Sequence, residues 1–199
     1  PLANCATCRL MRARTNQVRI IAGQWRGRRL TFPDARGLRP TPDRIRETLF
    51  NWLAPLLPGA CCLDLFAGSG ALGFEAASRG AAKVVMVDRN AEIVRALGSN
   101  RQLLSAHAVE IIQQEAGQYL SVRNGPFDLV FLDPPFQQSG LVDESIRKLA
   151  GSGSLKAGTR IYLEMPLKSP EPPLPESWHK EKEKKAGQVI YRLYRVQAA

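Results

Sequence analysis

The sequence predicts an α/β domain built on a doubly wound, parallel sheet, with a basic extension in front of it. From residue 60 onward, short apolar runs typical of strands alternate with helical segments, which favours parallel strands joined by crossovers. A glycine-rich turn follows the first of these strands, as in folds that bind nucleotides. The 199 residues are enough for one compact domain and a modest appendage.

The extension begins with a predicted basic β-hairpin. We expect strands at residues 18–22 and 28–32 around a glycine-bounded turn, after a flexible leader at residues 1–17. Trp25 stands at the tip among Arg26, Arg28 and Arg29, where an aromatic plane beside cations suits nucleic acid. Packing of Trp25 onto the core is an equal alternative.

A helix is predicted next, ending before Pro55. Thr41 can cap its N-terminus, Pro42 suits the first helical position, and Asp43 complements the helix dipole. The apolar side chains that recur at helical spacing belong to Ile45, Leu49, Trp52 and Leu53. The extension therefore spans residues 18–57, and the main domain spans residues 58–199.

The main domain divides into alternating elements. We expect strands at 61–66, 83–88, 109–113, 127–132 and 160–164, and helices at 71–78, 91–104 and 141–149. After a proline-rich connection, residues 178–185 and 188–195 form two closing strands around a tight turn. This hairpin ending departs from a purely parallel dinucleotide-binding fold.

Positive charge is concentrated at the N-terminus. The net charge is +10, and residues 1–50 hold eleven arginines against three acidic residues, with no lysine before Lys83. Arginine grips phosphates bidentately and stacks on bases, so a polyanionic partner is the natural expectation. A solvated basic surface, or one that touches anionic lipid, remains an alternative.

The cysteines and the hydropathy indicate the cellular compartment in which we expect the protein. Cys5 and Cys8 form a lone Cys-x-x-Cys without a second ligand pair, which argues against zinc, whereas Cys61 and Cys62 fall in a core strand. Such usage fits the reducing cytoplasm. No signal peptide opens the chain and no apolar run could span a bilayer, so we expect neither secretion nor membrane insertion.

The glycine-rich turn predicts a cofactor site. Gly68 and Gly70 let a ligand approach the backbone where a helix begins, and Gly73 permits close packing of that helix on the strand. Asp88, at the end of the second strand, can accept hydrogen bonds from ribose hydroxyls. These features would also suit a nicotinamide dinucleotide.

Asp64 favours S-adenosylmethionine over a dinucleotide. A carboxylate inside the turn repels a pyrophosphate but attracts an ammonium and a sulfonium. The alternative is that Asp64 caps local backbone amides. We also expect Phe66 and Ala116 to contact the cofactor, and Glu115 to reach the adenine amine unless it is simply at the surface.

The motif Asp133-Pro134-Pro135-Phe136 is the sharpest signal. It follows an apolar strand and lies at the carboxyl edge of the sheet, where open α/β folds bind ligands. Asp133 and the carbonyl of Pro134 can accept hydrogen bonds from a planar amino group, and Phe136 can stack on a base. The alternative is a rigid turn in which the aspartate only caps a helix.

At these residues the sequence resembles class I methyltransferases of the (Asp/Asn)-Pro-Pro-(Phe/Tyr) type, and within them the RsmD family. The resemblance runs from about residue 18 to the end and rests on motifs that appear in order: residues 19–23, 26–30, 38–53, 63–73 and 131–136. Asp88 and Glu115 stand where the family commonly has Glu and Asp. Residues 1–17 lie outside the resemblance.

The resemblance implies a Rossmann-like sheet of seven strands with the last one antiparallel, preceded by a hairpin and a helix, and the helix is expected to cover the cofactor. It implies methylation of guanine N2 in bacterial 16S ribosomal RNA, using S-adenosylmethionine and no metal. Arg39, Thr41 and Arg46 become candidate contacts to the methionine end or to the substrate. A salt-bridged surface would explain them equally well.

Three other functions remain open at this point. An adenine-N6 DNA methyltransferase or a glutamine N-methyltransferase would use the same amine-binding turn. A nicotinamide oxidoreductase is disfavoured by Asp64, and a non-catalytic RNA-binding assembly factor is disfavoured by the intact motif at 133–136. The residues do not reveal which nucleotide is modified or whether naked RNA or an assembled particle is the substrate.

Overall fold

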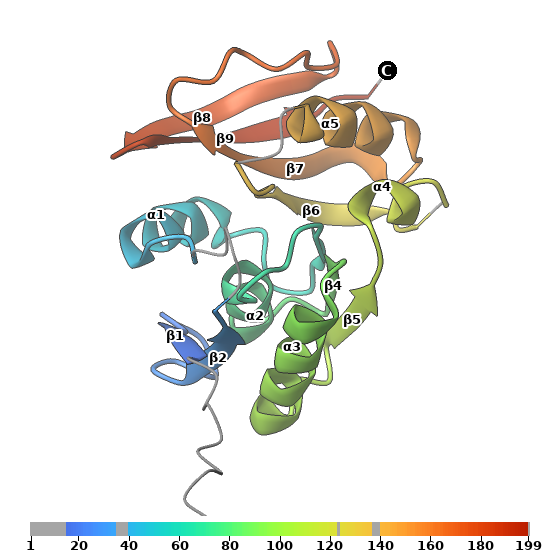
Figure 1. The fold of residues 1–199 in the computed structure, drawn as a ribbon. Helices are drawn as coiled ribbons and strands as arrows, with labels where there is room; N and C mark the ends of the chain where they lie inside the picture. The colour runs from blue at the N-terminus through green and yellow to red at the C-terminus, as the bar shows by residue number, and fades with distance from the viewer. Residues whose placement is uncertain (1–14, 35–39, 123, 137–139, 199) are drawn as a thin grey trace, which may run out of the picture.

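The computed structural model describes residues 15–34, 40–122, 124–136 and 140–198. These residues form a seven-stranded sheet with helices on both faces, together with a separate two-stranded hairpin (Figure 1). The order across the sheet is β5-β4-β3-β6-β7-β9-β8. Its strands are β3 (Cys61–Asp64), β4 (Lys83–Asp88), β5 (Val109–Gln113), β6 (Phe127–Leu132), β7 (Leu155–Pro166), β8 (Trp178–Ala186) and β9 (Val189–Val196).

The predicted fold class is confirmed. Strands β3 to β7 pair in parallel, whereas β9 is antiparallel to both β7 and β8. After β7 the chain first forms β8, which is the outermost strand on that side of the sheet. It then returns as β9, which lies between β7 and β8. Each parallel strand ends at one common edge, which we call the carboxyl edge, and begins at the opposite, amino edge.

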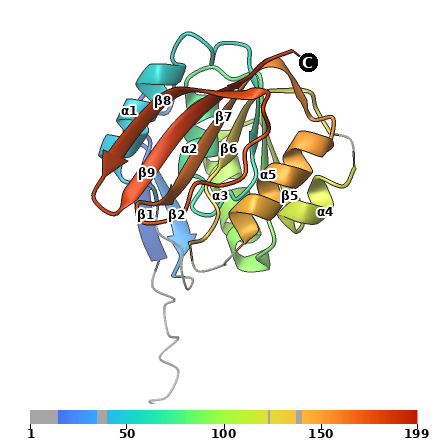
Figure 2. The same ribbon diagram turned by 90° about the horizontal axis from the view of Figure 1, so that it is seen from above.

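Helices cover both faces of the sheet (Figure 2). On one face lie α1 (Asp43–Leu53), α2 (Ala71–Ser78) and α3 (Ala91–Leu104), whose apolar residues join one core cluster. On the other face, α4 (Ala116–Tyr119) and α5 (Leu141–Gly151) contribute to a second cluster. The predicted bounds of α2 and α3 are confirmed, whereas α4 was not predicted.

The N-terminal hairpin consists of β1 (Thr15–Arg19) and β2 (Arg29–Pro33), displaced by up to three residues from the predicted strands. The displacement has a tertiary cause. The N–H groups of Ile21 and Ala22 donate to the carboxylate of Glu75 on α2, at 2.7 and 3.0 Å, instead of to a neighbouring strand. Ile21 and Ala22 therefore belong to a wide turn that is docked on α2, and not to strand β1.

The hairpin is fixed to the main domain through strand β2 and through its turn. Asn100 of α3 is buried and pairs with the backbone of Thr31, accepting from its N–H at 3.1 Å and donating to its carbonyl at 2.8 Å. At the turn, Gly23 has φ +83°, and a Cβ there would lie 1.9 Å from the carbonyl oxygen of Ser78. The hairpin and the domain consequently share one core.

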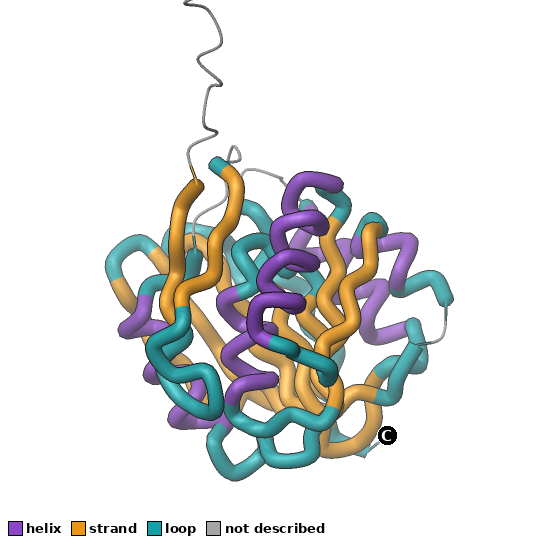
Figure 3. The backbone as a smooth tube through the Cα atoms, turned by 90° about the horizontal axis from the view of Figure 1, so that it is seen from below, coloured by secondary structure: helices purple, strands orange, loops and turns teal. Residues whose placement is uncertain are grey.

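The tip of the hairpin, residues 23–28, lies toward the amino edge of the sheet. The backbone N–H of Gln24 donates to the carbonyl of Ser78, the last residue of α2, and the Arg28 guanidinium donates to Leu103 near the end of α3. Both helices begin at the carboxyl edge and run back. Figure 3 shows the hairpin alongside α3.

Candidate active site

Four acidic side chains gather at the carboxyl edge, one from each of four neighbouring parallel strands. Asp64 ends β3, Asp88 ends β4, Asp133 follows β6, and Glu164 lies near the end of β7. None of the four forms an ion pair with another described residue. Carboxylates gathered without a cation are costly in a folded protein, so this edge has the character of a site for a ligand with positive charge or N–H donors.

The turn between β3 and α2 has the geometry that its glycines predicted. Gly68 and Gly70 have φ of +50° and +79°, a region that residues with a Cβ rarely adopt. A Cβ at Gly70 would lie 2.7 Å from the Leu97 side chain, and one at Gly73 would lie 2.8 Å from the sulfur of Met86. The predicted close packing of α2 on the sheet at Gly73 is confirmed.

Asp64 is buried at the floor of this turn. Its Oδ2 accepts the backbone N–H of Gly73 at 3.0 Å, so the aspartate does cap a local amide. Burial nevertheless raises the pKa of Asp64 to about 7, because hydrogen bonds from the backbone of Gly73 and Phe66 do not offset the loss of hydration. The charged form of Asp64 is therefore unfavourable in the ligand-free protein, and a cationic ligand would stabilise it.

Asp88 and Glu115 border the same turn. Asp88 is half-buried, and it accepts the N–H of Gly68 at 3.0 Å on Oδ2 and the N–H of Asn90 at 2.9 Å on Oδ1. Burial raises the pKa of Asp88, and these bonds oppose the rise. Glu115 precedes α4 and is about half exposed, with an ion pair to Arg89 at 3.3 Å. Ala116, next in sequence, is buried.

Asp133 lies where the motif predicted, directly after β6. Its Oδ2 accepts the hydroxyl of Thr41 at 3.2 Å, whereas its Oδ1 accepts no hydrogen bond from a described residue. Burial and the neighbouring charge of Glu164 hold the pKa of Asp133 well above its usual range. Asp133 thus offers one free acceptor atom and a strong tendency to take up a proton.

The aromatic and proline residues of the motifs differ in exposure. Pro134 is buried, and no described backbone N–H donates to its carbonyl. Phe136 is 47% exposed, so its ring is accessible from solvent. Phe66, beside the glycine turn, is half-buried and packs against the core cluster under α4 and α5.

Thr41 does not cap helix α1 as the sequence predicted. The N-terminal cap position of α1 is Pro42, and no side chain of a described residue caps the helix. The predicted Thr41 cap is therefore wrong, because the hydroxyl is already engaged by Asp133. The same contact brings the start of α1 to the carboxyl edge.

Arg46 is buried and bonded in the way expected of a residue that stabilises the fold. Its guanidinium is fully buried, where it donates to the carbonyls of Thr41 and Arg19 and to the Asp43 carboxylate at 3.1, 2.8 and 2.6 Å. It also lies 3.6 Å from the buried Glu75 carboxylate. A side chain enclosed in this way has no surface from which to contact RNA, so the substrate contact expected of Arg46 does not fit the structure.

The arginines of the hairpin are exposed. Arg26 makes no ion pair with a described residue, Arg28 bonds to the carbonyl of Leu103, and Arg29 bonds to Gln17 at 3.2 Å. Trp25 is half-buried against the core, which favours the packing alternative for its ring. Arg39 lies outside the described residues, as do Cys5 and Cys8.

One functional candidate at the carboxyl edge, Glu164, was missed by the sequence motifs. Glu164 is buried, and its Oε2 accepts the hydroxyl of Tyr162, a fully buried residue two positions earlier on β7. Burial raises the pKa of Glu164. The available signal was a single carboxylate inside the apolar run of β7, at the strand end that faces the motif after β6.

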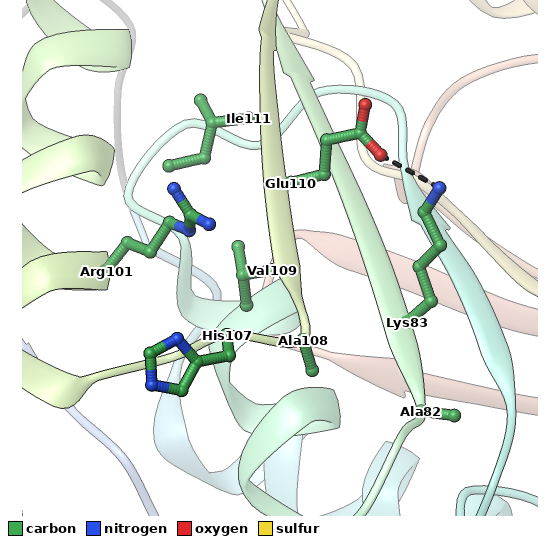
Figure 4. A pocket seen from close by; sticks show the side chains of 8 residues that line it. All are labelled: Ala82, Lys83, Arg101, His107, Ala108, Val109, Glu110 and Ile111. Atoms are coloured by element: carbon green, nitrogen blue, oxygen red, sulfur yellow. Dashed lines mark ion pairs between the residues drawn. The ribbon is translucent and has the colours of Figure 1, made fainter.

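A shallow hollow of about 500 Å³ lies away from these residues (Figure 4). It is bounded by Lys83 at the start of β4, Val109 at the start of β5, and Arg101 and His107 near the end of α3. Lys83 and Glu110, which both border the hollow, form an ion pair with each other at 2.9 Å. The hollow therefore belongs to the amino edge, and none of the predicted site residues borders it.

Cys61 and Cys62 are both free thiols, in agreement with their predicted place in a core strand. Burial raises the pKa of the Cys62 thiol to about 12, so this sulfur is not a nucleophile at neutral pH. In the described part of the chain, no helix combines the length and apolar character needed to cross a membrane.

Comparison with known proteins assigns the chain to a family. Residues 18–195 match the family described as conserved hypothetical protein 95. Over 184 residues, the chain is 46% identical to Ribosomal RNA small subunit methyltransferase D of Escherichia coli (strain K12), with 92% of each chain covered. The Haemophilus influenzae protein of the same name is 47% identical over 184 residues, covering 89% of this chain and 93% of that one.

A solved structure agrees in fold. The Escherichia coli protein yhhF superposes with a TM-score of 0.87 at 44% identity, covering 92% of this chain and 100% of the other. The N-terminal hairpin, the mixed seven-stranded sheet and the antiparallel return of β9 therefore belong to a fold shared with proteins of similar length.

Proposed function

The chain belongs to the RsmD family, and on this premise we propose that it transfers a methyl group from S-adenosylmethionine to the N2 amine of a guanine in small-subunit ribosomal RNA. The observation that carries the proposal is the pairing of two acceptors at the carboxyl edge. These are the free Oδ1 of Asp133 and the carbonyl of Pro134, beside acidic side chains that lack cationic partners. The names of the relatives favour RNA over DNA or protein as the substrate.

The residues around the glycine turn fit the cofactor. S-Adenosylmethionine supplies an electrophilic methyl group on a sulfonium centre. Asp64 would hold its positive charges, and Asp88 would accept hydrogen bonds from the ribose hydroxyls. Glu115, Ala116 and Phe66 would line the adenine end, and Thr41 would lie near the methionine end. A pyrophosphate beside Asp64 would be repelled, which disfavours a nicotinamide cofactor.

The substrate amine needs orientation because the lone pair of guanine N2 is delocalised into the ring. Asp133 and the Pro134 carbonyl would each accept one N2 hydrogen, which aims the lone pair at the methyl carbon. Phe136 would stack on the base from its exposed position. Most of the acceleration would then come from positioning and electrostatics, worth about 10 kcal/mol together.

The proton balance follows from the pKa of Asp133. As the N2–C bond forms and the C–S bond breaks, N2 gains positive charge and must lose a proton. Asp133 has a pKa well above the usual range for aspartate, so Oδ1 would accept that proton and pass it to water when product leaves. No histidine is needed in this step.

The hairpin arginines would bind the RNA backbone far from the reacting base. Helix α3 has fourteen residues and is therefore about 21 Å long, and the hairpin tip contacts its far end. Arg26, Arg28 and Arg29 would thus contribute affinity for RNA and would not touch the reacting groups.

Incubation of the protein with labelled S-adenosylmethionine and separate samples of small-subunit ribosomal RNA, assembled small subunits, DNA and total protein tests the proposal. We expect label only in the RNA-containing samples, recovered as N2-methylguanosine after nuclease digestion. Label in DNA or protein alone would reject the substrate, and no transfer to any sample would favour a non-catalytic RNA-binding factor.

A further inference from the structure

Glu164 has no part in the reaction as proposed above, although it neighbours Asp133. It is 4% exposed, it belongs to β7, and it has no ion pair with a described residue. The hydroxyl of Tyr162 bonds to Oε2, whereas Oε1 accepts no hydrogen bond from a described residue. Glu164 Oε1 is not among the fully buried side-chain atoms that lack a partner, so a ligand at the carboxyl edge can reach this oxygen and donate to it.

The register of the sheet places Glu164 next to Asp133. Leu132 of β6 pairs with Leu163 of β7, so the following residues, Asp133 and Glu164, are neighbours across adjacent parallel strands. Adjacent strands lie about 4.8 Å apart. The side chains of Asp133 and Glu164 are therefore neighbours at the carboxyl edge, and each has one oxygen that accepts no hydrogen bond from a described residue.

We propose that Glu164 determines the specificity for guanine by accepting a hydrogen bond from N1–H while Asp133 and Pro134 hold the N2 amine. The inference rests on the proposed function. In guanine, N1–H and the N2 amine are adjacent donors on one edge of the base, and two neighbouring acceptors match them. Tyr162 fixes the side chain so that its free oxygen is the one presented.

The same carboxylate would reject adenine. Beside its exocyclic amine, adenine carries an N1 lone pair in place of N1–H, and that lone pair would face the Glu164 oxygen. A buried acceptor that meets an acceptor loses its hydrogen bond and gains repulsion. The amine-binding turn alone cannot separate the two bases, because both present an amine to it.

2-Aminopurine separates a specificity role from a structural one. This base keeps the amine at C2 but has a lone pair at N1, so it offers the reacting group without the donor that Glu164 would bind. After mass spectrometry has located the guanine that the wild-type protein methylates, RNA carrying guanine or 2-aminopurine at that position is compared in single-turnover assays. We expect the wild-type protein to favour guanine by about tenfold or more.

Glu164→Gln should narrow this preference to within about threefold, because the amide can turn its NH₂ group toward the N1 lone pair of 2-aminopurine. Glu110→Gln, at an exposed carboxylate on the amino edge, should retain the wild-type ratio. An unchanged ratio in Glu164→Gln, in protein that binds S-adenosylmethionine normally, would overturn the inference.

Tyr162→Phe keeps the test decisive if Glu164→Gln does not fold. Without the Tyr162 hydroxyl the Glu164 carboxylate is less firmly oriented, so the guanine preference should fall at least threefold. A preference equal to that of the wild-type protein would overturn the proposed role of Glu164. Failure of the wild-type protein to methylate any guanine would instead reject the function on which the inference rests.

Discussion

The carboxyl edge of the sheet and the tip of the N-terminal hairpin carry opposite charges and hold them in opposite ways. At the carboxyl edge, Asp64 and Glu164 are buried without cations, and burial raises their pKa values. At the tip, the arginine side chains point to solvent while the backbone beneath them is docked on α2.

The difference separates two kinds of binding. A buried charge without a partner interacts strongly with whatever ligand completes it, because little water screens it. An exposed charge contributes affinity that salt weakens and that depends little on which nucleotide is bound. We therefore expect changes at the carboxyl edge to alter chemistry and specificity, and changes at the tip to alter only RNA affinity.

Asp133→Ala should have the largest effect. Loss of an acceptor on the reacting amine should raise the barrier by about 3 kcal/mol or more, which lowers the rate at least a hundredfold. Affinity for S-adenosylmethionine should change only a few-fold, measured by calorimetry beside single-turnover kinetics. Asp143→Ala, in the first turn of α5, is the matched control. A near-normal rate in Asp133→Ala would show that the amine is held elsewhere.

Cofactor affinity should depend on pH through Asp64, with a somewhat smaller effect. The pKa of Asp64 is about 7 in the ligand-free protein, so the side chain binds a proton as the pH falls below 7. That proton must leave when a cationic ligand binds, and affinity should fall by up to about tenfold per pH unit. Calorimetry at pH 8 and pH 6 measures this change, and NAD should not bind at either pH.

The raised pKa of Asp64 also determines whether the ligand-free protein becomes more or less stable as the pH falls. Because the folded-state pKa of Asp64 lies above the unfolded value, the charged form destabilises the ligand-free fold. The melting temperature should therefore rise as the pH is lowered from 8 to 6. Asp64→Asn should show a smaller rise, and Asp133 and Glu164 would supply what remains. A melting temperature that falls over this range would contradict the electrostatic argument.

Replacement of Arg26, Arg28 and Arg29 by alanine should have the smallest effect on chemistry. We expect weaker RNA binding, a flatter salt dependence and a higher KM, with kcat within about twofold of the wild-type value. Lys182, Lys184 and Lys185 on β8 are exposed and without ion pairs to described residues, so their triple alanine variant controls for net charge. Equal losses in both triple variants would remove the special role of the tip.

Local patterns predicted the regular elements of the main domain well. Helices α2 and α3 and strands β4, β5 and β6 have the predicted bounds, because apolar periodicity and the flanking glycine or asparagine signals coincide there. Strand β7 extends beyond both ends of the predicted 160–164 segment, since pairing with β6 and β9 supports residues that have no strand pattern of their own.

Contacts between distant segments account for the errors. Thr41 has the side chain of a helix cap, but its hydroxyl is engaged by Asp133, ninety-two positions away. Arg46 has the pattern of a surface residue, yet Glu75 and the carbonyl of Arg19 enclose it. Glu164 belongs to no motif, and only the register of β7 against β6 shows that it neighbours Asp133.

The most direct test of the account is the composition of small-subunit ribosomal RNA from cells that lack this protein. Nuclease digestion and mass spectrometry measure every methylated base at once. We predict the loss of one N2-methylguanine per small-subunit RNA, restored by the wild-type protein and not by Asp133→Ala. An unchanged N2-methylguanine content, together with the loss of another methylated base, would contradict the assignment of guanine N2 to the acceptors at the carboxyl edge.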